Sequence, residues 1–184
     1  MITAKQTKAL NNIIKSSKRA VFFGGAGVST ESGIPDFRSV DGLYHQKFKY
    51  PPETMLSHTF YETHTAEFFD FYRQKLIVHG AKPNAAHLRL AALEREGKCR
   101  AVVTQNIDGL HQAAGSKTVY ELHGSTLRNY CTRCGKFFPV QFIEDAAGVG
   151  DGVPCCDECG GIVKPDVVLY EEGLSQKTLY GAIE

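Results

Sequence analysis

Hydrophobic and polar positions along the chain predict short buried strands that alternate with amphipathic helices. Apolar runs bounded by glycine or polar residues predict strands at residues 20–23, 101–104 and 119–122. Apolar residues recur at helical spacing in residues 4–16 and 85–96, which predicts two helices. This order of strands and helices is typical of a parallel α/β sheet whose strands are joined by crossovers.

Two further helices and one irregular segment are expected. Residues 62–78 carry an aromatic stripe at helical spacing, and such a stripe usually forms part of a core. Thr3 and Gln6 have the spacing of a capping box at the start of the N-terminal helix. Another helix is expected to begin near Ser175. Residues 39–60 contain glycine and two prolines, which predicts a functional loop or a segment with short helices.

The composition excludes some classes of function. The 184 residues suit one domain with a small insert, and 42% hydrophobic residues are enough for a core. A net charge of +1 gives no general attraction to nucleic acid or to an anionic membrane. The N-terminal residues lack the apolar core of a signal peptide, and no apolar run is long enough to span a bilayer. We therefore expect a cytoplasmic protein with no membrane partner and no specific nucleic-acid partner.

A glycine-rich segment, residues 24–38, follows the first predicted strand, where dinucleotide sites usually begin. Ser29 and Thr30 are predicted to cap a helix and to offer backbone N–H groups to a phosphate. The dinucleotide fingerprint is incomplete, because Gly25 and Gly27 supply its first two glycines but Thr30 occupies the third position. From the glycines alone, a turn with a surface ion pair explains the segment as well as a nucleotide site does.

Polar residues follow the two later strands. Gln105, Asn106 and Asp108 come directly after the strand at residues 101–104, at the edge where open α/β sheets bind ligands. Turn and helix-cap chemistry is the alternative role for the asparagine and the aspartate. His123 follows the third strand, and imidazole is suited to accepting a proton near neutral pH. A lone histidine is more often structural.

Four of the six cysteines form two Cys-x-x-Cys pairs, each followed by glycine. Four thiolates fill the tetrahedral shell of Zn²⁺ and leave no position for water, so we predict one structural zinc per chain. Reduced cysteines without metal are the alternative. Cys155 lies outside the spacing and is interpreted as a bystander. The predicted ligands are Cys131, Cys134, Cys156 and Cys159.

Together these stretches resemble the signature of the sirtuins, the NAD-dependent protein deacylases. The resemblance rests on the glycine-rich segment, on Thr-Gln-Asn-Ile-Asp-Gly-Leu-His at residues 104–111, on Glu-Leu-His-Gly-Ser at residues 121–125 and on the cysteine pairs. It covers nearly the whole chain, in the family's order. It implies an α/β fold with a Rossmann-like parallel sheet, incomplete at the C-terminus, and a small lobe made of a zinc ribbon and a helical insert.

The resemblance also implies a division into domains. Residues 1–38, 84–127 and 164–184 are expected to form the partial NAD-binding domain. Residues 39–83 are expected to form the helical insert, and residues 128–163 the zinc-ribbon module. Because sirtuins continue past this point, the chain resembles a C-terminally truncated fragment.

Site residues are assigned by the same resemblance. His123 is implied to be the catalytic base, with Asn106 as a second catalytic residue. Val168 is implied to bind the backbone or amide of the acyl-lysine substrate, which adds to the protein as a strand. The residues implied to bind NAD are Gly25, Ala26, Gly27, Thr30, Asp36, Phe37, Arg38, Gln105, Asn106, Ile107, Asp108 and His123.

The implied activity is NAD-dependent removal of acetyl groups from protein lysines, which releases nicotinamide and O-acetyl-ADP-ribose. Protein mono-ADP-ribosyl transfer and a non-catalytic NAD- or ADP-ribose-binding zinc module remain as alternatives; a dehydrogenase is disfavoured by the incomplete fingerprint. Two departures from the family pattern concern the substrate. Glu171 stands in the position of a family glycine. Tyr72 is followed by Lys75 where desuccinylating members have arginine, which favours acetyl over succinyl groups.

Overall fold

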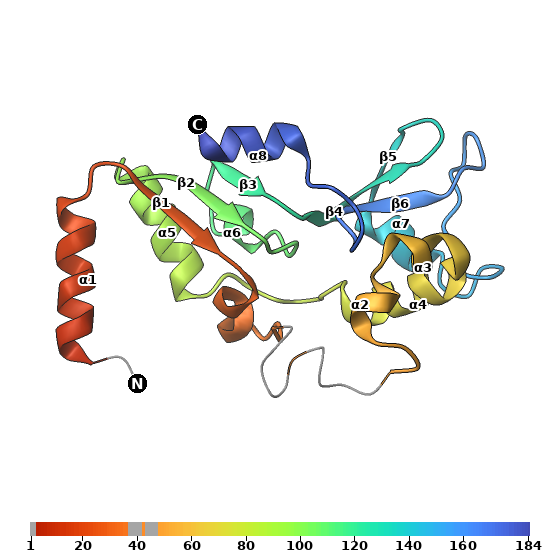
Figure 1. The fold of residues 1–184 in the computed structure, drawn as a ribbon, viewed down its shortest axis with the longest axis horizontal. Helices are drawn as coiled ribbons and strands as arrows, with labels where there is room; N and C mark the ends of the chain where they lie inside the picture. The colour runs from red at the N-terminus through yellow and green to blue at the C-terminus, as the bar shows by residue number, and fades with distance from the viewer. Residues whose placement is uncertain (1–2, 37–41, 43–47) are drawn as a thin grey trace.

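The structure is a computed structural model that describes residues 3–36, 42 and 48–184. A parallel sheet with its helices occupies one end of the molecule, and an antiparallel sheet with a second group of helices occupies the other (Figure 1). None of the helices in these ranges has the length and apolar character that crossing a bilayer requires.

The parallel sheet contains β1 (Ala20–Gly24), β2 (Cys99–Thr104) and β3 (Val119–Glu121), in the order β1-β2-β3. Val103 of β2 is paired with Phe23 on one side and with Tyr120 on the other. Five of the six residues of β2 are buried, as expected for a central strand of a parallel sheet. The three predicted strands are confirmed, with β2 beginning two residues earlier than expected.

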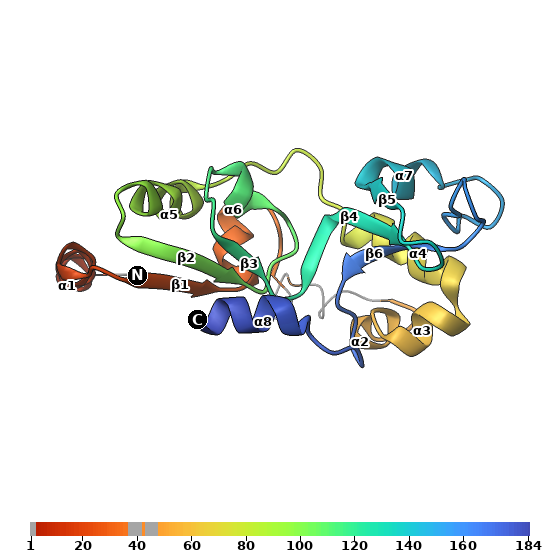
Figure 2. The same cartoon turned by 90° about the horizontal axis from the view of Figure 1, so that it is seen from above.

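Helices flank this sheet on both faces. α5 (Ala85–Arg95) and α6 (Leu110–Ala113) lie on one face and α8 (Gln176–Ile183) on the other, as Figure 2 shows. The predicted capping box of α1 (Ala4–Ser16) is present, and Ser175 caps α8. The parallel strands are therefore joined by helical crossovers, with α5 before β2 and α6 between β2 and β3, as the order of apolar segments predicted.

The antiparallel sheet has the strand order β5-β4-β6, with β4 (Gly124–Cys131) at its centre. β5 (Phe137–Pro139) leads into α7 (Val140–Asp145), and β6 (Val163–Val167) returns along the other side of β4. β6 pairs with β4 and not with the parallel sheet. The last part of the chain therefore contacts both sheets. β6 pairs with β4 in the antiparallel sheet, and α8, which follows β6, packs against β3 of the parallel sheet.

Three helices cover the second sheet: α2 (Pro52–Met55), α3 (His58–Thr63) and α4 (Thr65–Lys75). The helix predicted over residues 62–78 is confirmed as α4 with narrower bounds, because His64, whose φ of −133° and ψ of 47° are not helical, separates it from α3. The aromatic stripe is core. Phe68, Phe69 and Tyr72 are fully buried, and the two phenylalanine rings meet edge to face with their centroids 5.3 Å apart.

Candidate functional site

The carboxyl ends of the three parallel strands meet at one edge of the sheet. The Gln105 N–H donates to the Gly24 carbonyl (3.0 Å), and the Leu122 N–H donates to the Thr104 carbonyl (2.9 Å). These bonds continue the strand pairing one step beyond the strands, so the segments that follow β1, β2 and β3 start side by side. The glycine-rich turn, the polar loop after β2 and His123 all begin at this edge, which is where open α/β sheets bind ligands.

The glycine-rich segment turns at Gly25 into η1, a 3-10 helix (Ala26–Ser32). The prediction that Ser29 and Thr30 cap a helix is wrong, because both lie inside η1 and its first turn has no side-chain cap. The Thr30 hydroxyl donates instead to the Gly27 carbonyl (3.0 Å). A side chain at Gly27 would meet nothing within 4 Å, so this turn leaves open space in which a ligand can approach the backbone.

A buried hydrogen-bond network joins η1 to the loop after β2. The Ser29 hydroxyl donates to Asp108 Oδ2 (2.6 Å) and accepts from Asn106 Nδ2 (3.0 Å). Ser29 is 1% exposed and Asn106 8% exposed. Asp108 also has the turn and helix-cap role that was the alternative for it, since its Oδ1 accepts a hydrogen bond from the N–H of Leu110 at the start of α6 (2.9 Å). The sequence indicated the asparagine and the aspartate, but it did not indicate that Ser29 connects them.

His123 lies at the point where the two sheets join. Its carbonyl accepts a hydrogen bond from the Val168 N–H (3.0 Å), so the predicted catalytic base and the predicted substrate residue are neighbours. Gly124 has a φ of +80°, and a side chain there would overlap the Asp166 carbonyl. Glycine is therefore required after His123 for β4 and β6 to approach each other.

Arg128 fixes this junction. Its Nη1 lies 2.7 Å from Glu121 at the end of β3, and its Nε lies 2.9 Å from Asp166 on β6. The Glu121 side chain is only 7% exposed, so this bond is better shielded from solvent than a surface ion pair. The arginine therefore ties the strand before His123 to the strand that follows the zinc-ligand segment.

The remaining predicted NAD-binding residues are placed as follows. Ile107 is partly buried and packs against the aromatic core, and its carbonyl accepts from Thr126 N (3.0 Å) and Thr126 Oγ1 (3.1 Å). Gln105 is exposed, and Ala26 opens η1. Asp36 is partly buried. Phe37 and Arg38 lie outside the described residues.

Two buried histidines lie beside this network and were not indicated by the sequence. His87 of α5 and His111 of α6 are 0% and 1% exposed, and their ring centroids are 4.7 Å apart. Burial, reinforced by the neighbouring His87, lowers the pKa of His111 to about 4, against a smaller opposing effect of Asp108. Burial also lowers the pKa of His87. Both rings are therefore neutral at physiological pH.

The four cysteines of the two pairs converge, with all four Sγ atoms within 4.8 Å of one another. Cys131 and Cys159 Sγ are 3.3 Å apart, and Cys134 and Cys156 Sγ are 3.7 Å apart. Tetrahedral Zn²⁺ with Zn–S bonds of about 2.3 Å separates its sulfurs by about 3.8 Å, so the donor set fits zinc. A side chain at Gly161 would stand 2.9 Å from Cys131 Sγ, so glycine is needed beside the cluster.

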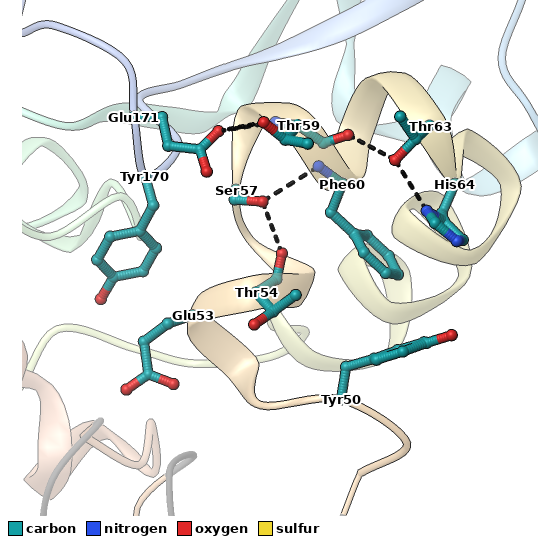
Figure 3. Close-up of a pocket in the computed structure, with 10 residues that line it drawn as sticks. All are labelled: Tyr50, Glu53, Thr54, Ser57, Thr59, Phe60, Thr63, His64, Tyr170 and Glu171. Atoms are coloured by element: carbon teal, nitrogen blue, oxygen red, sulfur yellow. Dashed lines mark hydrogen bonds between the residues drawn. The ribbon is translucent and has the colours of Figure 1, made fainter.

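A hollow of about 450 Å³ lies on the helical side, between α2, α3 and the segment after β6 (Figure 3). Glu171 stands at its rim with a φ of +77°, and its carboxylate accepts from the backbone N–H (2.9 Å) and hydroxyl (2.8 Å) of Thr59. Those bonds lower the pKa of Glu171. The hollow is lined by Tyr50, Glu53, Thr54, Ser57, Thr59, Phe60, Thr63, His64, Tyr170 and Glu171. None of the described residues predicted to bind NAD is among them.

The model of the Sir2 family matches residues 25–184. The chain belongs to the Sir2 family. It is 58% identical over 186 residues to an NAD-dependent protein deacetylase of Clostridium acetobutylicum. The matched region covers 100% of this chain and 75% of that protein. It is 60% identical over 178 residues to the protein of the same name from Clostridium tetani, covering 96% of this chain and 71% of that one.

Solved Sir2 structures have the same fold. The structure of Sir2 with a p53 peptide and NAD⁺ superposes with a TM-score of 0.83 at 41% identity, covering 96% of this chain and 70% of that one. A Sir2 variant with a deacetylated p53 peptide and 3′-O-acetyl-ADP-ribose gives a TM-score of 0.87 at 40% identity, with the same coverage.

For this member of the Sir2 family, the predicted fold class is confirmed, with a parallel sheet beside a zinc-ribbon and helical lobe. NAD⁺ is the co-substrate of the family, and the four-cysteine cluster fits one structural zinc. The division into domains and the roles of individual site residues stay predictions.

Proposed function

We propose that this Sir2 protein removes acetyl groups from lysines of proteins in an NAD-dependent reaction. The observation that carries the proposal is the convergence at one sheet edge of the Asn106–Ser29–Asp108 network, His123 and the Val168 backbone. The names of the Clostridium relatives, NAD-dependent protein deacetylases, support the same activity.

NAD, as the co-substrate, supplies an activated ribose carbon that takes up the acetyl oxygen as nicotinamide is released. The open backbone at Gly27 gives its phosphates close access to N–H groups. Asn106 and Asp108 offer an amide and a carboxylate whose positions are fixed by Ser29. His123 accepts a proton at a ring nitrogen from a hydroxyl group. The acetyl-lysine backbone is held beside Val168, one hydrogen bond away from His123.

Zinc has a structural role in this proposal. Four thiolates complete its coordination, so it does not activate water. The cysteines hold together two loops at one end of the antiparallel sheet, the turn between β4 and β5 and the loop that precedes β6, whereas the opposite end of β4 and β6 carries the junction next to His123. We also propose the division given above, with residues 39–83 and 128–163 as the two parts of the small lobe. The cytoplasmic location stays a prediction.

The acyl group is proposed to be acetyl. Tyr72 is fully buried within the aromatic core, and the ammonium group of Lys75 lies over the Phe48 ring, 5.3 Å from its centroid. Lysine at this position lacks the planar two-point geometry with which arginine binds a carboxylate. Rates on peptides that differ only in acetyl or succinyl lysine test this choice, and faster removal of succinyl would contradict it.

The proposed activity is tested by nicotinamide release from NAD in the presence and absence of an acetyl-lysine peptide. We expect release that depends on the peptide, and we expect its steady-state rate over many turnovers to fall by about 10²–10⁴-fold in His123→Ala, the range for loss of a general base. His79→Ala is the matched control, because the His79 side chain is exposed and, within the part of the chain that the structure describes, bonds only to Glu144. Equal activity of His123→Ala and wild type would reject His123 as the base.

A further inference from the structure

Asn84 carries hydrogen bonds of two kinds. Its Oδ1 accepts from the N–H groups of Ala86 (2.9 Å) and His87 (3.4 Å), which caps the start of α5. Its Nδ2 donates to the carbonyl of Val28 (2.7 Å), which lies in η1 and is 56 positions earlier in the chain. The first set is local to the helix, whereas the second connects the helix to the glycine-rich segment.

The bond to the Val28 carbonyl lies next to the hydrogen-bond network of Ser29, Asn106 and Asp108. Val28 directly precedes Ser29, whose hydroxyl joins Asn106 and Asp108. η1 is a seven-residue 3-10 helix with no side-chain cap at its start, and runs of this length have weaker hydrogen-bond geometry than an α-helix. It therefore depends on tertiary contacts to keep its shape, and Asn84 supplies one from the capped start of α5.

We propose that Asn84 is a positioning residue for NAD binding. Through the Val28 carbonyl it holds η1 in the conformation that keeps Ser29 between Asn106 and Asp108. The consequence for NAD rests on the function proposed above, whereas the effect on η1 does not. Asn84 itself is not placed in contact with the reacting groups.

Two substitutions separate the bridging role from the capping role. Asn84→Asp keeps an acceptor for the α5 N–H groups, but it removes the donor and places a carboxylate oxygen against the Val28 carbonyl. Asn84→Ser is also a good cap and is too short to reach Val28. The matched control is Gln141→Glu, which makes the same amide-to-acid change on α7, where the Gln141 side chain bonds, among the residues that the structure describes, only to Asp145 one turn away.

The first measurement is amide hydrogen exchange without NAD. We expect the amides of residues 26–34 to exchange about tenfold faster in both Asn84 variants, the effect of losing one hydrogen bond to a partly buried carbonyl. The amides of residues 88–95 in α5 are expected to keep their wild-type protection. Unchanged exchange in residues 26–34, or equal acceleration in η1 and α5, would overturn the proposal, because the side chain would then serve only as a helix cap.

The second measurement is steady-state kinetics of nicotinamide release with the same proteins. If ordering of η1 precedes binding, the KM for NAD should rise by about tenfold while kcat changes by less than about twofold, because only a fraction of the free protein is competent to bind. A fall in kcat at constant KM would overturn the positioning role. Faster exchange of η1 in a chain that releases no nicotinamide would reject the proposed function and leave the Asn84 bridge intact.

Discussion

The buried histidine pair predicts a specific loss of stability in mild acid. Neither ring nitrogen of His111 has a hydrogen-bond partner among residues 3–36, 42 and 48–184, and Nδ1 of its neighbour His87 is bonded to the Asn84 N–H (3.3 Å). Protonation of His111 would place an unpaired charge among Phe22, His87 and the start of α6. The folded protein therefore keeps this ring neutral at a pH where the unfolded chain binds a proton.

The size of the effect follows from the two pKa values of His111. They are about 6.5 in the unfolded chain and about 4 in the folded protein. Between these values the unfolded state binds more protons, so the free energy of unfolding falls as the pH falls and is fully retained above pH ~6.5. From pH 7 to pH 4 the loss attributable to this residue is about 3 kcal/mol, a large part of the stability of an ordinary domain.

The test compares wild type with His111→Phe, which keeps an aromatic ring beside Phe22 but cannot ionise. Urea unfolding is followed by far-UV circular dichroism at several pH values, because the chain contains no tryptophan. We expect the variant to lose about 3 kcal/mol less than wild type between pH 7 and pH 4. Protonation of the zinc-ligand cysteines and of carboxylates is common to both proteins and cancels in the difference.

His79→Phe is the control, because it makes the same substitution at a side chain that is 73% exposed, whereas His111 is buried. It should retain the pH dependence of wild type. If the stability curves of wild type and His111→Phe run parallel from pH 7 to pH 4, the reasoning from burial to a neutral imidazole is refuted.

Three further predictions concern other parts of the molecule. Cys156→Ala should lose the bound zinc and lower the melting temperature, whereas Cys155→Ala should keep about one zinc per chain by metal analysis; equal zinc in both would reject the assignment of the ligands. Glu171→Gly should be about 1 kcal/mol more stable than Glu171→Ala in urea unfolding, because both lose the Thr59 bonds but only glycine fits a φ of +77° without strain; the reverse order would contradict this. Tyr72→Phe should raise the free energy of unfolding by about 1 kcal/mol, since it removes a buried hydroxyl that has no hydrogen-bond partner among the described residues, and a clear loss of stability would show that the hydroxyl is bonded.

The sequence was sufficient for features that depend on neighbouring residues. The capping box at Thr3 and Gln6, the bounds of α1 and the three parallel strands all follow from local pattern, and the structure confirms them. The cysteine pairs were equally informative, because the spacing of zinc ligands is itself a local property.

Features made by distant segments could not be read in this way. The helix predicted over residues 62–78 is observed as α4 (Thr65–Lys75), and the non-helical backbone of His64, which separates it from α3, has no signal in the periodicity. Ser29 was interpreted as a helix cap and Asn84 was not singled out, because the contacts of both side chains across the fold depend on how η1 and α5 pack. The burial of His111 likewise arises only when α5 lies against α6.

The central claim is that this Sir2 chain deacetylates lysine at the edge where His123, Asn106 and Val168 meet. Mass spectrometry of the products from NAD and an acetyl-lysine peptide tests it most directly. The account predicts equal amounts of nicotinamide, O-acetyl-ADP-ribose and free-lysine peptide, all lost together in His123→Ala and retained in His79→Ala. Nicotinamide released with the acetyl group still on the peptide, or with ADP-ribose attached to protein, would contradict it.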